Sequence, residues 1–137
     1  MFAKIKDKKQ HGYAVMMINK EKTAVVMERK GLKLEDREVG TTQKSFDEMR
    51  EVVLESKEPR YILADVTYER EGAGKKDVVV YIYWCSDGVS VKQKMVYAST
   101  NEALKKSFTG IKCVECHDDD EFTYDFIVAK LKQQDRA

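Results

Sequence analysis

Two long runs of β-branched and aromatic residues constrain the fold more than any other feature of this chain. The first run covers residues 60–69 (RYILADVTYE), and the second covers residues 77–85 (DVVVYIYWC). Side chains of these types are enriched in strands because they fit a pleated, half-buried surface. Only the short glycine-containing segment 71–74 (EGAG) separates the runs. We therefore expect a hairpin, with its aromatic residues packed in the core.

Shorter patterns predict the elements before this hairpin. Residues 11–19 (HGYAVMMIN) and 22–28 (KTAVVME) are typical of two strands joined by a turn. The polar segment 31–42 then predicts a loop. A capping-box pattern at 45–48 (SFDE) predicts a helix that runs to about Lys57, before Pro59.

The second half of the chain predicts a further strand and two helices. Residues 91–97 are read as extended, and Ser99 with Glu102 forms an S-x-x-E pattern that predicts a helix over 99–108. A short strand is expected over 111–116. An acidic run at 118–121 then suits the start of a last helix, because the N-terminal end of the helix dipole favours carboxylates. The apolar stripe of that helix contains Tyr124, Ile127, Val128 and Leu131.

Length, charge and cysteine content exclude several classes of protein. A chain of 137 residues suits one domain, so we expect a single domain over 1–137. The 25 basic and 24 acidic residues give a formal net charge of +1, which does not favour general attraction to nucleic acid. No apolar run approaches the roughly 20 residues of a membrane span. Three cysteines without a visible export signal favour a reduced, cytoplasmic location.

Three motifs are compatible with chemistry, but each has a simpler explanation. Residues 113–117 match the C-x-x-C-H pattern of covalent haem attachment, yet they lie on a predicted strand in a chain without an export signal. A redox thiol pair, and a zinc site completed by His11 or Cys85, remain as alternatives. The segment 72–76 (GAGKK) is only a fragment of a phosphate loop, and the acidic run lacks calcium-binding spacing. We expect no catalytic residue, cofactor or metal.

Residues 92–110 (KQKMVYASTNEALKKSFTG) instead indicate a surface that binds another macromolecule. Lys92 and Lys94 are two residues apart, so they share one face if the segment is extended. Lys105 and Lys106 follow at the end of the predicted helix. A simple solvated face, with an i,i+4 pair between Glu102 and Lys106, is the alternative.

This block resembles the actin-depolymerising factor/cofilin family. The resemblance is specific over 91–110 and weaker over the rest of residues 4–132, where 60–65, 84–87 and 123–124 contribute. It implies a single ADF-homology domain of the α/β (α+β) type. Such a domain has a central mixed sheet of about five strands, flanked by helices on both faces.

The resemblance also implies roles for individual residues. The long helix and the segment before it would contact actin through Met95, Tyr97, Ser99, Asn101, Glu102, Lys105 and Lys106. The side that faces a neighbouring filament subunit would contain Lys92, Lys94, Arg70, Lys75, Lys76 and Lys130. At the last of these positions the family has an acidic-basic pair, whereas this chain has Ala129-Lys130. Phosphatidylinositol bisphosphate would bind Lys92, Lys94, Lys105 and Lys106.

One departure from the family concerns the start of the chain. The family begins with about a dozen further residues, including a serine whose phosphorylation switches off actin binding. This sequence opens MFAKIKDKK. We therefore expect the first helix to be shortened or missing, with Phe2, Ala3 and Ile5 as its remnant, and the regulatory serine to be absent.

The function implied is a cytoplasmic, cytoskeletal, non-enzymatic protein that binds actin filaments and monomers and promotes filament severing and depolymerisation. We expect a monomer that binds no nucleic acid. Two relatives of the same fold are alternatives. Coactosin-like proteins bind filament sides without depolymerising them, and glia-maturation-factor-like proteins bind the branch-nucleating complex.

Overall fold

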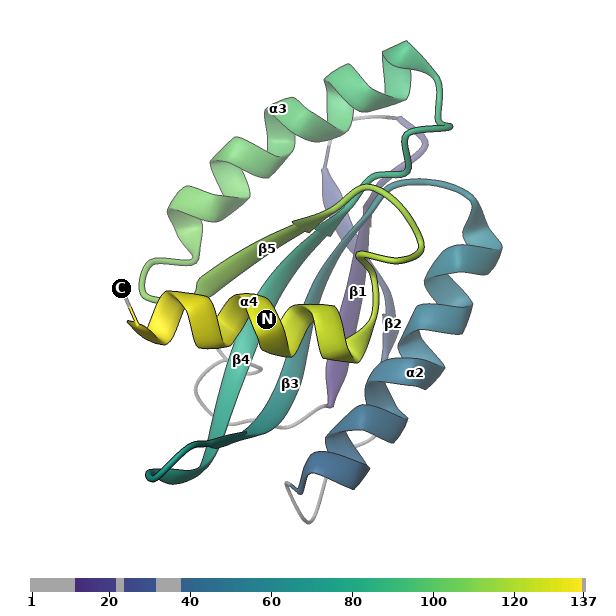
Figure 1. The fold of residues 1–137 in the computed structure, drawn as a ribbon. Coiled ribbons are helices and arrows are strands. Elements are labelled where there is room, and N and C mark those ends of the chain that lie inside the picture. Colours follow the sequence, from purple (N-terminus) through teal and green to yellow (C-terminus); the bar gives the residue numbers. More distant parts are fainter. Residues whose placement is uncertain (1–11, 22–23, 32–37, 137) are drawn as a thin grey trace.

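The computed structural model describes residues 12–21, 24–31 and 38–136, and in this part of the chain a five-stranded sheet separates two helical layers (Figure 1). The strand order is β2-β1-β3-β4-β5, with only the β4–β5 pair parallel. The elements are β1 (Tyr13–Ile18), β2 (Val25–Lys30), α2 (Val39–Ser56), β3 (Arg60–Arg70), β4 (Gly74–Trp84), α3 (Val91–Ser107), β5 (Lys112–Cys116) and α4 (Tyr124–Arg136). The expected mixed sheet with helices on both faces is therefore confirmed.

The hairpin of β3 and β4 forms the centre of the molecule, as its composition predicts. The two strands pair without interruption from Arg60 opposite Trp84 to Arg70 opposite Gly74. Gly72 in the connection and Gly74 at the start of β4 have φ values of 73° and 75°. Glycine adopts this left-handed region without steric cost, so a tight turn is available here.

Alternate residues of these strands enter two separate cores. Ile62 and Ile82 belong to the core under α2 and α4, whereas Leu63 and Tyr81 belong to the core under α3. Successive side chains of a strand point to opposite faces, and a sheet buried on both faces therefore reads as a continuous apolar run. This explains why the two runs stand out in the sequence.

Helix α2 begins earlier than its sequence predicts. Its N-cap is Glu38, and a capping box links Glu38 with Thr41, so the capping box expected at 45–48 is wrong and residues 39–42 are helical. Thr42 and Phe46 are already buried in the first turns, and this tertiary packing extends the helix beyond the weaker local signal. The helix ends at Ser56, and Lys57 follows in the left-handed conformation.

A buried hydrogen-bond cluster ties α4 to the sheet and to α2. The Tyr124 hydroxyl donates to the Thr67 carbonyl (2.5 Å) and accepts from the Thr67 N–H (3.1 Å). It also lies 2.6 Å from the hydroxyl of Thr42. Buried polar groups are costly unless they are paired, so this cluster fixes how α4 lies against the base of the hairpin. The predicted apolar stripe of α4 is confirmed, because Tyr124, Ile127 and Leu131 are buried.

Other boundaries differ modestly from expectation. Strand β2 lies at 25–30, and β4 begins at Gly74. The acidic run 118–121 forms turns before α4, whose Phe126 N–H is capped by the Thr123 hydroxyl instead. The expected remnant of a first helix, and the first two residues of the strand expected over 22–28, lie outside the described residues. Within the described ranges, none of the helices is long and apolar enough to cross a membrane.

Candidate functional site

Among the helices that the structure describes, α3 is the one that covers this face of the sheet, and it presents a long surface to solvent (Figure 1). It begins at Val91, where the Ser90 side chain accepts a hydrogen bond from the Gln93 N–H (3.2 Å). The expectation that 91–97 is extended is therefore wrong. The pattern formed by Ser99 and Glu102 lies in the middle of the helix and does not cap it. The last turn of α3 contains Lys105 and Lys106, whose positive charges suit the negative end of the helix dipole.

Two predicted contact residues of α3 face the sheet instead of solvent. Tyr97 is 6 % exposed and Asn101 is 3 % exposed. The Tyr97 hydroxyl accepts a hydrogen bond from the Ile18 N–H at the end of β1 (3.2 Å). Tyr81 donates to the Asn101 side-chain oxygen (2.7 Å). This burial does not fit direct contact with a partner, and both side chains act in positioning the helix.

Burial governs the chemistry of the tyrosines beneath α3. Burial raises the pKa values of Tyr61 and Tyr81 well above their usual range. Both hydroxyls therefore stay protonated and act as donors, Tyr61 to the Tyr97 carbonyl (2.7 Å) and Tyr81 to Asn101. These bonds hold α3 at a fixed rotation and height over the sheet.

The outward surface of α3 carries a short apolar stripe. Val91 is 71 % exposed and Met95 is 69 % exposed, and they lie four residues apart on one side of the helix. Ser99, Glu102 and Lys106 are also exposed. Exposed large apolar side chains without a described cover indicate an interaction surface. Sequence reasoning found Met95 but missed Val91, because the reading of this segment as extended hid its i,i+4 relation to Met95.

Lys92 and Lys94 lie on opposite flanks of α3, which corrects the expectation that they share a face. Residues two apart on a helix point roughly 200° apart. Lys92 lines a hollow on the β1 side of the helix, together with Met17 and Ile18. Lys94 lines a second hollow on the β5 side, together with Glu115 and His117. The two lysines therefore do not form a single basic patch.

Lys105 and Lys106 also differ in their surroundings. The Lys105 ammonium lies 3.8 Å from Glu102 and 3.6 Å from Glu115. Lys106 is exposed and has no ion pair among the described residues. The i,i+4 pair of Glu102 with Lys106, which belonged to the alternative interpretation, is thus replaced by an i,i+3 pair of Glu102 with Lys105. Of the two lysines, Lys106 is therefore the one whose charge is available to a partner protein.

The β3–β4 hairpin carries a separate group of basic residues at the other end of the molecule. In Figure 1 its tip lies at the bottom of the view, far from the N-terminal end of α3 at the top. Lys75 pairs with the N-cap residue Glu38 (2.9 Å), and Arg70 donates to the Ala73 carbonyl (3.1 Å). Lys76 is partly buried. Lys75 is therefore tied to the start of α2, a contact that the sequence did not indicate.

Lys130 belongs to neither group. It is exposed on α4, where its ammonium lies 5.4 Å above the ring of Phe126. Helices α3 and α4 cover opposite faces of the sheet. The six residues predicted for one filament-facing side are therefore distributed over α3, the hairpin and α4.

The C-x-x-C-H motif lies on β5, and its two thiols enter different cores. Cys113 packs against the core under α3, whereas Cys116 belongs to the core under α2 and α4. Burial raises the pKa of Cys116 to about 12, and burial also raises the pKa of Cys113. Neither thiol has the lowered pKa that activates a cysteine nucleophile. Within the ranges that the structure describes, no cluster of His, Cys, Asp or Glu could hold a metal ion.

Known proteins of one family match the chain over nearly its whole length. The family model described as "Cofilin/tropomyosin-type actin-binding protein" matches residues 1–132. Cofilin from Schizosaccharomyces pombe is 30% identical over 134 residues, which cover 97% of this chain and 89% of that protein.

Solved structures agree with this match. The solution structure of the ADF-like protein UNC-60A from Caenorhabditis elegans has a TM-score of 0.77 at 27% identity, covering 97% of this chain and 89% of that one. Coactosin from Entamoeba histolytica has the same fold, with a TM-score of 0.72 at 17% identity, covering 99% of this chain and 91% of that one. The chain belongs to the cofilin/ADF family of actin-binding proteins.

Proposed function

We propose that this protein binds actin monomers and filaments, without catalysing a covalent reaction, and promotes the disassembly of filaments in the cytoskeleton. The observation that carries the proposal is the outward surface of α3, where Val91, Met95 and Lys106 are exposed on the segment that most resembles the family. A ligand shifts an equilibrium only by its differential affinity for the two states. Disassembly therefore requires that the protein binds a twisted or dissociated form of actin more tightly than the intact filament.

Co-sedimentation with actin filaments tests this proposal. The pellet reports bound protein, and the supernatant reports released actin. We expect saturable binding at micromolar protein in low salt, together with a rise in supernatant actin. Binding without released actin would favour a coactosin-like filament-side binder, the second candidate that the shared fold supports. No binding at tens of micromolar protein would contradict both.

Phosphatidylinositol bisphosphate is proposed as a competing ligand, with a narrower site than the four lysines expected from the sequence. Lys105 is paired with two carboxylates, and Lys94 lies on the flank that also contains Glu115. Lys92 and Lys106 are the exposed cations of this set without an ion pair in the described part of the chain. Binding to a polyanionic head group should therefore depend most on Lys92 and Lys106, and it should weaken as salt rises.

Lys105 and Lys106 are expected to contribute unequally to actin binding. Lys106→Ala should weaken monomer binding roughly fivefold, which corresponds to about 1 kcal/mol, because it removes an unpaired exposed cation. Lys105→Ala should weaken binding less, since its charge is already shared between Glu102 and Glu115. Fluorescence titration of labelled actin monomers measures both affinities. Equal losses for the two variants would contradict this assignment.

A further inference from the structure

We propose that the hollow on the β1 side of α3 receives an apolar side chain of the bound actin, and that Lys20 at its rim attracts an acidic neighbour of that side chain. This inference rests on the proposed function, since it assigns a new part of the same binding surface. It adds Lys20 and the side chains of Met17 and Gln93 to the residues proposed to contact actin.

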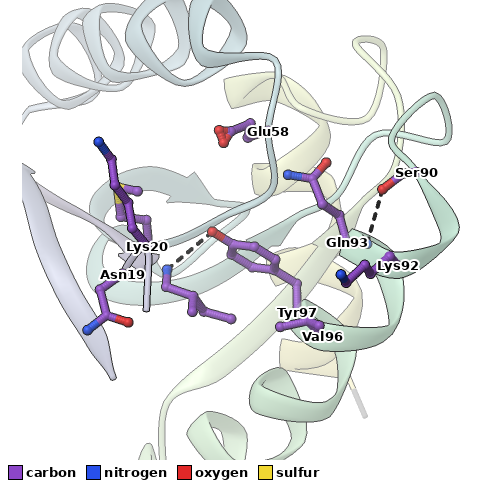
Figure 2. Close-up of a pocket in the computed structure, with 10 residues that line it drawn as sticks. Asn19, Lys20, Glu58, Ser90, Lys92, Gln93, Val96 and Tyr97 are labelled. Atoms are coloured by element: carbon purple, nitrogen blue, oxygen red, sulfur yellow. Dashed lines mark hydrogen bonds between the residues drawn. The ribbon is translucent and has the colours of Figure 1, made fainter. Parts of the chain in front are cut away.

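The hollow lies between the end of β1 and the N-terminal half of α3 (Figure 2). Its volume is about 280 Å³. Met17, Ile18, Val96 and Tyr97 supply its apolar lining. Pockets for complete small-molecule ligands usually measure about 300–1,000 Å³. A hollow just below this range suits one or two side chains of a protein partner better than a cofactor.

One polar group of the hollow, the Tyr97 hydroxyl, already has a partner within the protein. The Tyr97 hydroxyl accepts the hydrogen bond of the Ile18 N–H, as the dashed line in Figure 2 shows. The occupant therefore does not have to donate a hydrogen bond to this hydroxyl. Apolar surface that enters the hollow gains roughly 25 cal/mol for each Å² removed from water. The chemistry of the lining thus favours an aliphatic or aromatic side chain.

The charges at the rim favour an acidic partner. Lys20 lies on the strand side of the hollow and Lys92 on the helix side, with Glu58 also at the rim (Figure 2). Neither lysine has an ion pair or hydrogen bond among the described residues, and the formal charge of these three groups is positive. The remaining polar rim residues, Asn19, Ser90 and Gln93, are neutral. Complementary charge at an interface speeds association and fixes the orientation of the partner.

The hollow is continuous with the exposed stripe of α3. Lys92 follows Val91 in the sequence, and Val96 follows Met95, so stripe and hollow occupy adjoining sides of the same two helical turns. A protein surface that covers Val91 and Met95 would therefore lie at the mouth of the hollow. A single protein partner bound along α3 would therefore cover the stripe and also occupy the hollow.

The test uses a charge-reversal variant, a variant with a bulky side chain at the hollow, and a matched control for the charge reversal. Lys20→Glu reverses the rim charge, and Gln93→Trp fills the mouth of the hollow. Lys44→Glu makes the same charge change at an exposed position of α2, on the other face of the sheet. We expect Lys20→Glu and Gln93→Trp each to weaken binding to actin monomers about tenfold, and Lys44→Glu to change it less than twofold. Circular dichroism and thermal melting establish that each variant is folded.

A second measurement probes the hollow without any substitution. With ¹³C-labelled methionine methyl groups, addition of actin monomers should shift or broaden the Met17 signal and leave that of Met49, which is fully buried on the other face, much less changed. The inference is wrong and the proposed function stands if wild type binds, Lys20→Glu binds like Lys44→Glu, Gln93→Trp binds like wild type, and the Met17 signal changes no more than that of Met49. If wild type itself does not bind actin, the proposed function fails and this inference fails with it.

Discussion

The double variant Val91→Glu, Met95→Glu is expected to lose at least about a hundredfold in affinity for both actin monomers and filaments. Both side chains are about 70 % exposed, so the folded protein tolerates the change. In a complex that buries this stripe, two carboxylates would be taken from water without a partner, and uncompensated burial of a charge is costly. Apolar anchors near the centre of an interface carry much of its binding energy.

A control with the same chemistry is available on β2. Val26 is also an exposed valine, at 38 %, but it lies on the edge strand of the sheet and not on α3. Val26→Glu should bind actin with nearly the affinity of wild type. Co-sedimentation and monomer titration measure all variants, and circular dichroism verifies their folding. Retention of binding by the double variant would show that α3 does not use this stripe to bind actin.

The central sheet could be predicted from the sequence because its signal is local and strong. Both faces of β3 and β4 are buried over residues 61–68 and 80–84, so most positions in these stretches are apolar or aromatic. The stripe of α4 is also evident, because Ile127 and Leu131 recur at helical spacing. In these elements the residues that define the secondary structure are the same residues that form the core.

The start of α3 could not be predicted in this way. The segment after Ser90 buries only one side of helix α3, and the outward side of this helix carries Val91 and Met95. Exposed apolar residues next to the buried Tyr97 produce no helical stripe, so the segment resembles a strand. A surface that binds a partner breaks the rule that apolar residues face the core, and the prediction failed at the proposed site for this reason.

The predicted roles of the lysines depended on where α3 begins. With 91–97 extended, Lys92 and Lys94 would act together; on a helix they belong to different hollows. Likewise, only the three-dimensional structure shows that Lys105 meets Glu115 on β5, or that Lys75 meets Glu38 at the start of α2. These partners are distant in the sequence, and no local pattern indicates them.

The largest effect on stability is expected at Phe122. This residue is fully buried, and its ring stacks on Trp84 with ring centroids 4.9 Å apart. It also makes an edge contact with Phe46 of α2 at 5.7 Å. Phe122→Ala should lower the free energy of unfolding by about 3–5 kcal/mol, because it removes buried apolar surface and leaves a cavity next to Trp84 of β4 and Phe46 of α2. Urea denaturation followed by circular dichroism measures this loss.

Two further variants keep the result interpretable if Phe122→Ala does not fold. Phe122→Leu retains most of the apolar volume and should lose less than half as much stability. Phe126→Ala truncates the same residue type where it is only partly buried, and it should also lose less. A loss below about 1.5 kcal/mol for Phe122→Ala would contradict the packing described here.

Phe122→Leu also tests whether stability and actin binding depend on different parts of the molecule. Phe122 belongs to the core under α2 and α4, whereas the proposed actin-binding surface lies on α3, over the other core. Phe122→Leu at a temperature where it is fully folded should therefore bind actin monomers with the affinity of wild type. Weakened binding by this folded variant would show that the two faces of the sheet are coupled, and that the core under α2 and α4 also contributes to the position of α3.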